Sequence, residues 1–203
     1  MIIFQKITWR NFLSTGNTPI EINLREHPTT LVIGKNGSGK STVLDALCFA
    51  LFNKPYRIIK KDQMINTINN ADSMVEVWFS VGPKNYQVRR GIKPNVFEIY
   101  EDGVLINQNA SGVDYQKYLE TNIMKLNYRS FCQVVILGSS SYEPFMKMRA
   151  SYRRDVIEEI LDIKVFASMN ILLRGRQQEL AKEITTLRPV SYTHLTLPTR
   201  LMV

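Results

Sequence analysis

The sequence has little cysteine and no long hydrophobic run. Its 203 residues include two cysteines, Cys48 and Cys132, which form no CxxC pair and lie in apolar stretches. No apolar segment approaches the ~20 residues of a membrane span, and the N-terminus MIIFQKITWRNF has no signal-peptide architecture. We therefore expect a cytoplasmic protein with buried, reduced thiols and no membrane partner.

Acidic residues are also outnumbered. The chain has 26 Lys+Arg against 18 Asp+Glu, which gives a net charge of +8. A polyanion partner fits this charge, and so does a basic protein without such a partner. The sequence has no zinc finger and no homeodomain recognition helix, so any contact with double-stranded DNA should be non-specific and directed at the backbone.

The residue patterns alternate between strand and helix, which predicts an α/β fold. Strands are expected over 2–9, 20–24, 29–33, 75–81, 86–90, 96–100, 104–106 and 131–137. The strands from 75 to 106 predict an antiparallel β meander with a hairpin turn at Glu101-Asp102-Gly103. Helices are expected from Ser41, over 114–125, and from Ser151 to about Leu187.

The last of these helices carries a heptad pattern. Its apolar residues recur at spacings of four, seven, four and three: Met169, Leu173, Leu180, Ile184 and Leu187. This spacing predicts the start of a coiled coil, although about three heptads also allow an isolated helix. We expect residues 1–150 to form an N-terminal lobe and residues 151–187 to form the helix that leads into the coiled coil.

The pattern changes at Arg188. Residues 188–203, RPVSYTHLTLPTRLMV, contain two prolines and no acidic residue. They resemble translated adapter or vector sequence, so we expect the helix to end near Leu187 and the tail to be non-native. A genuine short C-terminus is the alternative.

A glycine-rich turn carries the clearest chemical signal. Residues 34–41, GKNGSGKS, fit G-x-x-x-x-G-K-[ST], the P-loop or Walker A motif. The motif's backbone N–H groups wrap phosphates, its lysine contacts the β- and γ-phosphates, and its final hydroxyl can ligate Mg²⁺. We therefore predict an ATP–Mg²⁺ site, with Ser41 as the Mg²⁺ ligand. The predicted cofactor-binding residues are Gly34, Lys35, Asn36, Gly37, Ser38, Gly39, Lys40, Ser41 and Thr42.

The parts that hydrolysis requires are missing from the sequence. No run of four apolar residues is followed by Asp-Glu or Asp-Asp, the usual source of the carboxylate on Mg²⁺. Asp45 lies inside the predicted P-loop helix, and Asp155 and Glu158 lie on a late helix. We therefore expect the chain to bind ATP without turning it over.

Three segments together resemble a known family. They are ITWRNFLSTGNTPIEINL, TTLVIGKNGSGKSTVLDALCFALFNK and VEVWF, and the similarity continues through residues 128–138 and 153–163. They resemble the N-terminal half of an SMC-like ATPase head of the SbcC type, the DNA double-strand-break repair ATPases. The resemblance is strongest to the bacteriophage members, the large subunits of a recombination endonuclease, which would place the protein in the host cytoplasm.

The resemblance implies a split P-loop head of the ABC/SMC type. A long coiled coil separates its two lobes, and ATP is sandwiched between the heads of a homodimer that works with a nuclease subunit. The alternatives are an SMC-like chromosome-organising ATPase and a transporter-type ATP-binding subunit. The heptad pattern argues against the transporter type, because those domains continue into a signature motif instead.

Several further residues are candidates through this resemblance. In many relatives a glutamine follows the apolar strand directly, but here the strand ends Leu137-Gly138-Ser139. Gln133 is the substitute candidate, with an ordinary strand residue as the alternative. Possible DNA or nucleotide contacts are Arg10, Asn11, Arg57, Lys60 and Lys61. A solvated surface cluster is the alternative for Arg57, Lys60 and Lys61.

Overall fold

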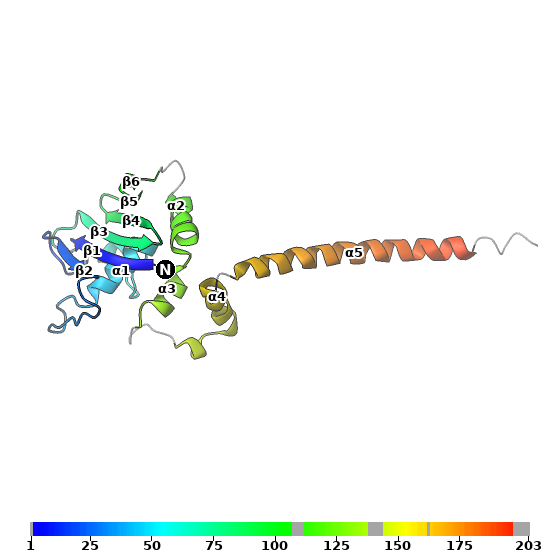
Figure 1. The fold of residues 1–203 in the computed structure, drawn as a ribbon, viewed down its shortest axis with the longest axis horizontal. Coiled ribbons are helices and arrows are strands. Elements are labelled where there is room, and N and C mark those ends of the chain that lie inside the picture. The colour runs from blue at the N-terminus through cyan, green and yellow to red at the C-terminus, as the bar shows by residue number, and fades with distance from the viewer. Residues whose placement is uncertain (1, 107–111, 138–143, 162, 197–203) are drawn as a thin grey trace, which may run out of the picture. The chain divides into compact units, whose positions relative to one another are not determined.

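The computed structural model describes residues 2–106, 112–137, 144–161 and 163–196. The chain divides into two units, Met1–Val156 and Ile157–Val203. The first unit holds a sheet with helices packed around it, and the second consists mainly of one long helix (Figure 1).

A six-stranded antiparallel sheet forms the frame of the first unit, in the order β2-β1-β3-β4-β5-β6. Its strands are β1 (Ile2–Arg10), β2 (Ile20–Asn23), β3 (Ser73–Val81), β4 (Lys84–Ile92), β5 (Val96–Glu101) and β6 (Val104–Leu105). The predicted meander is confirmed, because β3 to β6 pair in sequence order. At the predicted hairpin turn, Asp102 and Gly103 take φ values of 48° and 83°, as a two-residue hairpin loop requires.

Helix α1 (Thr42–Phe52) packs against β1, β3 and β4. Successive side chains of a strand point to opposite faces of the sheet. In β3 the alternate residues Val75, Val77 and Phe79 are fully buried, while the residues between them are only partly buried. The Phe49 ring of α1 lies 5.5 Å from the Phe12 ring. This core fixes the helix that directly follows the P-loop.

The apolar run at 131–137 is not a strand. It contributes to α3 (Tyr128–Val134), which follows α2 (Gly112–Tyr118) and the π-helical turn η2 (Leu119–Met124). The Asn127 side chain accepts a hydrogen bond from the Ser130 N–H at 2.9 Å and caps α3. The strand prediction was wrong because a short apolar run does not reveal its own period. The predicted helix over 114–125 is confirmed by α2 and η2.

The predicted strand at 29–33 is also absent. Leu31 and Ile33 are 81% and 84% exposed, and the segment pairs with none of the described strands. A β-branched run has a high strand propensity, but a strand forms only where a neighbour accepts its backbone hydrogen bonds. The P-loop therefore follows an exposed segment without regular secondary structure.

The predicted helix from Ser151 to Leu187 is two helices. α4 (Ala150–Ile160) contains the division between the units, and α5 runs from Lys164 to Thr196. The prediction that the helix ends near Leu187 is wrong, because Pro189 lies inside α5. A proline in a helix removes one hydrogen bond and strains the preceding turn, which costs free energy but does not forbid the helix.

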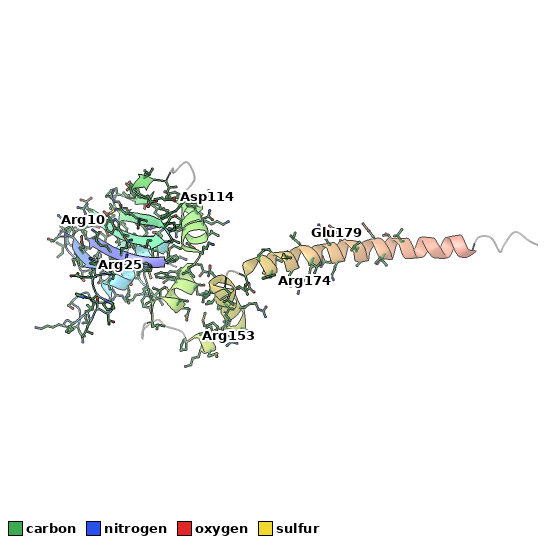
Figure 2. All side chains as sticks on the ribbon, in the orientation of Figure 1. Arg10, Arg25, Asp114, Arg153, Arg174 and Glu179 are labelled. Atoms are coloured by element: carbon green, nitrogen blue, oxygen red, sulfur yellow. The ribbon has the colours of Figure 1, made fainter. Side chains whose placement is uncertain are left out.

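Helix α5 is exposed along its described length. Its heptad residues are 55–67% exposed, and the labelled side chains of Arg174 and Glu179 project outward from it (Figure 2). No helix in the described part of the chain is long and apolar enough to cross a membrane. The two cysteines are free thiols; Cys48 is buried and Cys132 half-buried.

Candidate functional site

The P-loop connects the exposed segment 29–33 to the N-terminus of α1. Gly37 and Gly39 take φ values of 85° and 88°, in the left-handed region that glycine enters at little cost. Among the described residues, no acceptor takes a hydrogen bond from the backbone N–H of Gly37, Gly39, Lys40 or Ser41. These donors lie just before a buried helix whose dipole also favours an anion at this end.

A cavity of about 560 Å³ opens beside this loop, and we call it the P-loop cavity. It is lined by Leu13, Ser14, Asn36, Gly37, Gly39, Lys40, Ser41, Thr42, Arg57, Ile59, Gln63, Ile65 and Thr67. Six of the nine predicted cofactor-binding residues are therefore brought to one cavity. Gly34, Lys35 and Ser38 belong to the loop without lining it.

Lys40 folds back over its own loop. Its Nζ donates to the carbonyl oxygens of Gly34 at 2.7 Å and Lys35 at 2.8 Å. No carboxylate in the described part of the chain forms an ion pair with it. Its positive charge therefore stays available to an anion in the cavity.

Ser41 occupies the N-cap position of α1 without acting as a side-chain cap. The residue is exposed and lines the P-loop cavity. A hydroxyl that is not used for capping can serve as a ligand for a cation, which is the role predicted for it.

A buried carboxylate places Arg57 at the same cavity. Asp45 is fully buried in the first turn of α1, and its two oxygens accept from the Arg57 backbone N–H at 2.9 Å and from Arg57 Nε at 2.7 Å. Arg57 Nη2 also lies 2.5 Å from Asp45 Oδ2, and a guanidinium held through both Nε and Nη2 has few orientations left. The predicted contact residue Arg57 therefore lines the P-loop cavity.

Sequence reasoning missed the far wall of the P-loop cavity. Ser14 comes from the loop after β1, while Ile59 and Gln63 come from the segment around η1 (Lys61–Met64). The bridge between Phe12 and Ile65 holds these two segments together. No local pattern marks such residues, because tertiary pairing alone brings them to the cavity.

The other candidate residues lie elsewhere. Arg10 lines a separate cavity of about 210 Å³ with Glu76 and Arg89. Asn11 is 2% exposed; its Oδ1 accepts from Asn69 at 2.6 Å, so its side chain joins loops together.

Lys60, Lys61 and Gln133 do not line the P-loop cavity either. Lys60 and Lys61 are exposed, and Lys61 lines a cavity near the other end of α1. Gln133 is half-buried in α3 rather than in a strand.

The sequence matches a family model described as "AAA domain" over residues 6–188. Exonuclease subunit 2 of Escherichia phage RB69 is 41% identical over 175 residues, which is 86% of this chain and 31% of the relative. The exonuclease subunit 2 of Enterobacteria phage T4 is also 41% identical, over 82% of this chain and 30% of the relative. The chain thus spans about a third or less of these relatives' length.

The chain is also similar to a more distant relative and to a solved structure. A DNA double-strand break repair Rad50 ATPase from Thermoplasma volcanium is 27% identical, over 91% of this chain and 20% of the relative. The Smc head domain from Pyrococcus furiosus, solved with the C-terminal domain of ScpA, has a TM-score of 0.57 at 19% identity. That likeness covers 98% of this chain and 54% of the other, and it shows the fold alone.

Proposed function

The chain belongs to the AAA domain family, a P-loop ATPase family, and from that premise we propose that it is the ATP-binding N-terminal half of a DNA-repair and recombination ATPase. The observation that carries the proposal is the P-loop cavity, where unbonded backbone N–H groups, Lys40 and Ser41 converge. The similarity to phage exonuclease subunit 2 supports a partnership with a nuclease subunit, in the cytoplasm of the host.

The residues of this cavity fit ATP and Mg²⁺. The N–H groups of Gly37, Gly39 and Lys40 would bind phosphate oxygens, and Lys40 Nζ would exchange the loop carbonyls for the β- and γ-phosphates. The Ser41 hydroxyl would ligate Mg²⁺, which neutralises phosphate charge when it is bound. Arg57, paired with Asp45, lines the edge of the same cavity.

Hydrolysis needs groups that this arrangement does not bring together. Asp45, the carboxylate nearest the loop in sequence, is held by Arg57, and the described residues contain no cluster suited to a metal ion. We propose that a second lobe of the whole protein supplies the missing carboxylate, and that ATP is sandwiched between two such heads. The uncovered run 29–33 supports this proposal, because a second lobe can pair with it.

Helix α5 would begin the coiled coil between the lobes. Its exposed heptad residues form the apolar seam that a second helix would cover. The nuclease subunit would dock near the coil root, between residues 155 and 169. Residues 1–150 would be the N-terminal lobe, and residues 188–203 a non-native tail.

Contact with DNA would be non-specific. The exposed residues Lys60 and Lys61 and the half-exposed Arg10 can neutralise backbone phosphates, and the net charge of +8 favours approach to a polyanion. Asn11 would support that surface through its hydrogen bonds to the neighbouring loop. Gln133 remains a candidate for a modified water-sensing position.

Steady-state phosphate release tests the proposal. The purified chain is expected to bind ATP–Mg²⁺ and to release phosphate no faster than its Lys40→Ala variant. Turnover on the order of 1 s⁻¹, an ordinary enzyme value, that disappears in Lys40→Ala would mean that this chain holds a complete ATPase site.

A further inference from the structure

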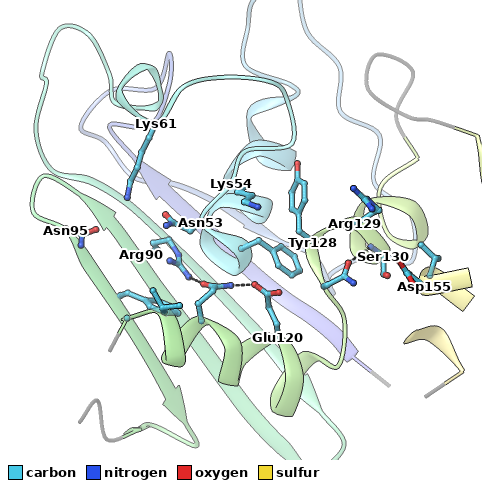
Figure 3. Close-up of a pocket in the computed structure, with 17 residues that line it drawn as sticks. Asn53, Lys54, Lys61, Arg90, Asn95, Glu120, Tyr128, Arg129, Ser130 and Asp155 are labelled. Carbon is cyan, nitrogen blue, oxygen red and sulfur yellow. Dashed lines mark hydrogen bonds between the residues drawn. The ribbon is translucent and has the colours of Figure 1, made fainter. Parts of the chain in front are cut away.

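A second and larger cavity lies at the C-terminal end of α1, within the first unit (Figure 3). Its volume is about 760 Å³, and β4, α2, η2 and the N-terminal part of α3 contribute to its walls. A cavity of this size can take a ligand as large as a mononucleotide. We call it the Arg90 cavity, after the buried residue that the following paragraphs describe.

Arg90 is 5% exposed and forms no ion pair with a carboxylate in the described part of the chain. Its Nε donates to the Ala50 carbonyl at 2.9 Å, its Nη2 donates to Gln116 Oε1 at 2.6 Å, and its guanidinium lies 3.7 Å from the centre of the Phe97 ring. Its Nη1 has no hydrogen-bond acceptor among the described residues. Burial lowers the pKa of Arg90 to about 9, which reflects the free-energy cost of a charge withdrawn from water.

The rest of the cavity adds positive charge. Figure 3 shows Lys61 projecting from η1 toward Asn53 and Arg90, with Lys54 beside Tyr128. The charged lining residues are Lys54, Lys61, Arg90, Arg129, Glu120 and Asp155, which leaves a net charge of +2. Glu120 accepts from Gln116 Nε2 at 2.7 Å, so Gln116 links this carboxylate to Arg90 without an ion pair.

We propose that the Arg90 cavity binds a small phosphate dianion, either inorganic phosphate or a phosphomonoester, with Arg90 as its central cation. A dianion matches the net charge of the lining, and the free Nη1 with the lysines on the rim offers more donors than one carboxylate can use. A terminal or free phosphate can reach a buried guanidinium, whereas the continuous backbone of a DNA duplex cannot. This proposal does not rest on ATP binding at the P-loop.

A purely structural role for Arg90 is the rival explanation. Arg90 and Gln116 donate to the carbonyls of Ala50 and Leu51 in the last turn of α1, where a cation offsets the helix dipole. That role uses one of the five N–H groups of the guanidinium for the helix and one for Gln116. It accounts for neither Nη1 nor the lysines on the rim.

Isothermal titration calorimetry with inorganic phosphate and with AMP tests the proposal. The full chain carries Lys40→Ala to disable the P-loop, and chloride keeps the ionic strength constant. Arg90→Gln, which keeps an amide donor, is expected to weaken phosphate binding at least tenfold. Arg89→Gln is the matched control, because Arg89 is the next residue on β4 and pairs with Glu76 and Glu98; its affinity should change less than twofold.

A second variant covers the case in which Arg90→Gln does not fold. Lys54 and Arg129 are exposed on the rim, so the double variant Lys54→Ala/Arg129→Ala should fold and bind phosphate three- to tenfold more weakly. Unchanged affinity in this variant would overturn the proposal. Equal affinity of the parent chain for succinate would also overturn it, by showing a general carboxylate site.

Two further ligands test whether the bound phosphate can be the 5′-phosphate of a DNA end. Short single-stranded oligonucleotides with and without a 5′-phosphate are titrated into the same chains. Binding that requires the 5′-phosphate and Arg90 supports the proposal, with a DNA end as the source. Equal binding of both oligonucleotides through Arg90 would show recognition of the backbone and contradict it.

Discussion

The P-loop cavity and the Arg90 cavity lie at opposite ends of α1 and offer positive charge by different means. At the N-terminus the charge comes mainly from backbone N–H groups, the helix dipole and Lys40. At the C-terminus the dipole has the opposite sign, and the positive charge comes from the buried Arg90, which donates to a carbonyl of the last turn. The glycines of the P-loop form a motif that can be recognised in the sequence, whereas Arg90 on β4 belongs to no such motif.

The two ends also differ in how their cations are held. Arg57 near the P-loop is fixed by the buried carboxylate of Asp45, so its charge is largely neutralised. Among the described residues, the hydrogen-bond partners of the Arg90 side chain are neutral. The unbalanced charge therefore lies on Lys40 at one end of the helix and on Arg90 at the other.

Lys40→Ala is expected to have the largest effect on nucleotide binding. Losing a charge-assisted contact of about 3 kcal/mol should weaken ATP binding about 100-fold while the fold is kept, because the side chain is not part of the core. Fluorescence titration with an ATP analogue measures this. Lys182→Ala is the control, since Lys182 is an exposed residue of α5 in the second unit. Equal losses in the two variants would contradict a specific role for Lys40.

Asp45→Asn removes the negative charge that pairs with the Arg57 guanidinium. The Arg57 side chain is 42% exposed, so we discount the usual cost of breaking a buried pair and expect a loss of about 2 kcal/mol in the free energy of unfolding. Urea denaturation gives the value, with exposed Asp62→Asn as the control. A loss no larger than that of the control would show that Asp45 does not hold Arg57.

Tyr128→Phe examines the wall of the Arg90 cavity. The hydroxyl donates to the Pro55 carbonyl at 2.8 Å, so its removal should cost about 1 kcal/mol at neutral pH. Burial, more than the neighbouring Cys132, raises the pKa of Tyr128. Above pH ~10 the unfolded chain loses this proton first, so stability falls as the pH rises.

The phenylalanine variant should therefore lose stability less steeply with pH. The difference should be below about 1.4 kcal/mol per pH unit, because the ring is only half-buried. Urea denaturation between pH 8 and 11 measures it, with exposed Tyr118→Phe as the control. Parallel pH profiles for Tyr128→Phe and the parent chain would contradict a raised pKa.

Truncation after Leu187 should have the smallest effect on the free energy of unfolding of the first unit, which contains both cavities. The removed residues belong to the second unit, and their loss should change the unfolding of the first unit by no more than about 0.5 kcal/mol. Thermal unfolding of the truncated chain measures it. A loss of several kcal/mol, or of ATP affinity, would identify the tail as a native packed element.

The sequence was informative where a local rule determines the structure. The P-loop could be predicted because glycines at positive φ and the start of a helix are local features. The Asp102-Gly103 hairpin turn could be predicted for the same reason. The antiparallel meander followed from the alternation of buried and exposed residues in β3.

The sequence was misleading where pairing decides the structure. Residues 29–33 have strand propensity but no partner among the described strands, and the apolar run at 131–137 belongs mostly to a capped helix. The Asn127 cap, three residues before Ser130, was the one local signal that could have shown this. Gln63 and Ile59 reach the P-loop cavity through tertiary pairing that no short pattern reveals.

Backbone amide NMR of the chain during titration with ATP–Mg²⁺ tests the central claim most directly. The N–H groups of Gly37, Gly39, Lys40 and Ser41 donate to no acceptor in the described structure, so bound phosphates should shift these signals most. The signals of Arg90 and Gln116 should shift less than those of the P-loop. The largest shifts at Arg90 and Gln116, with none in the P-loop, would contradict the assignment of the nucleotide site.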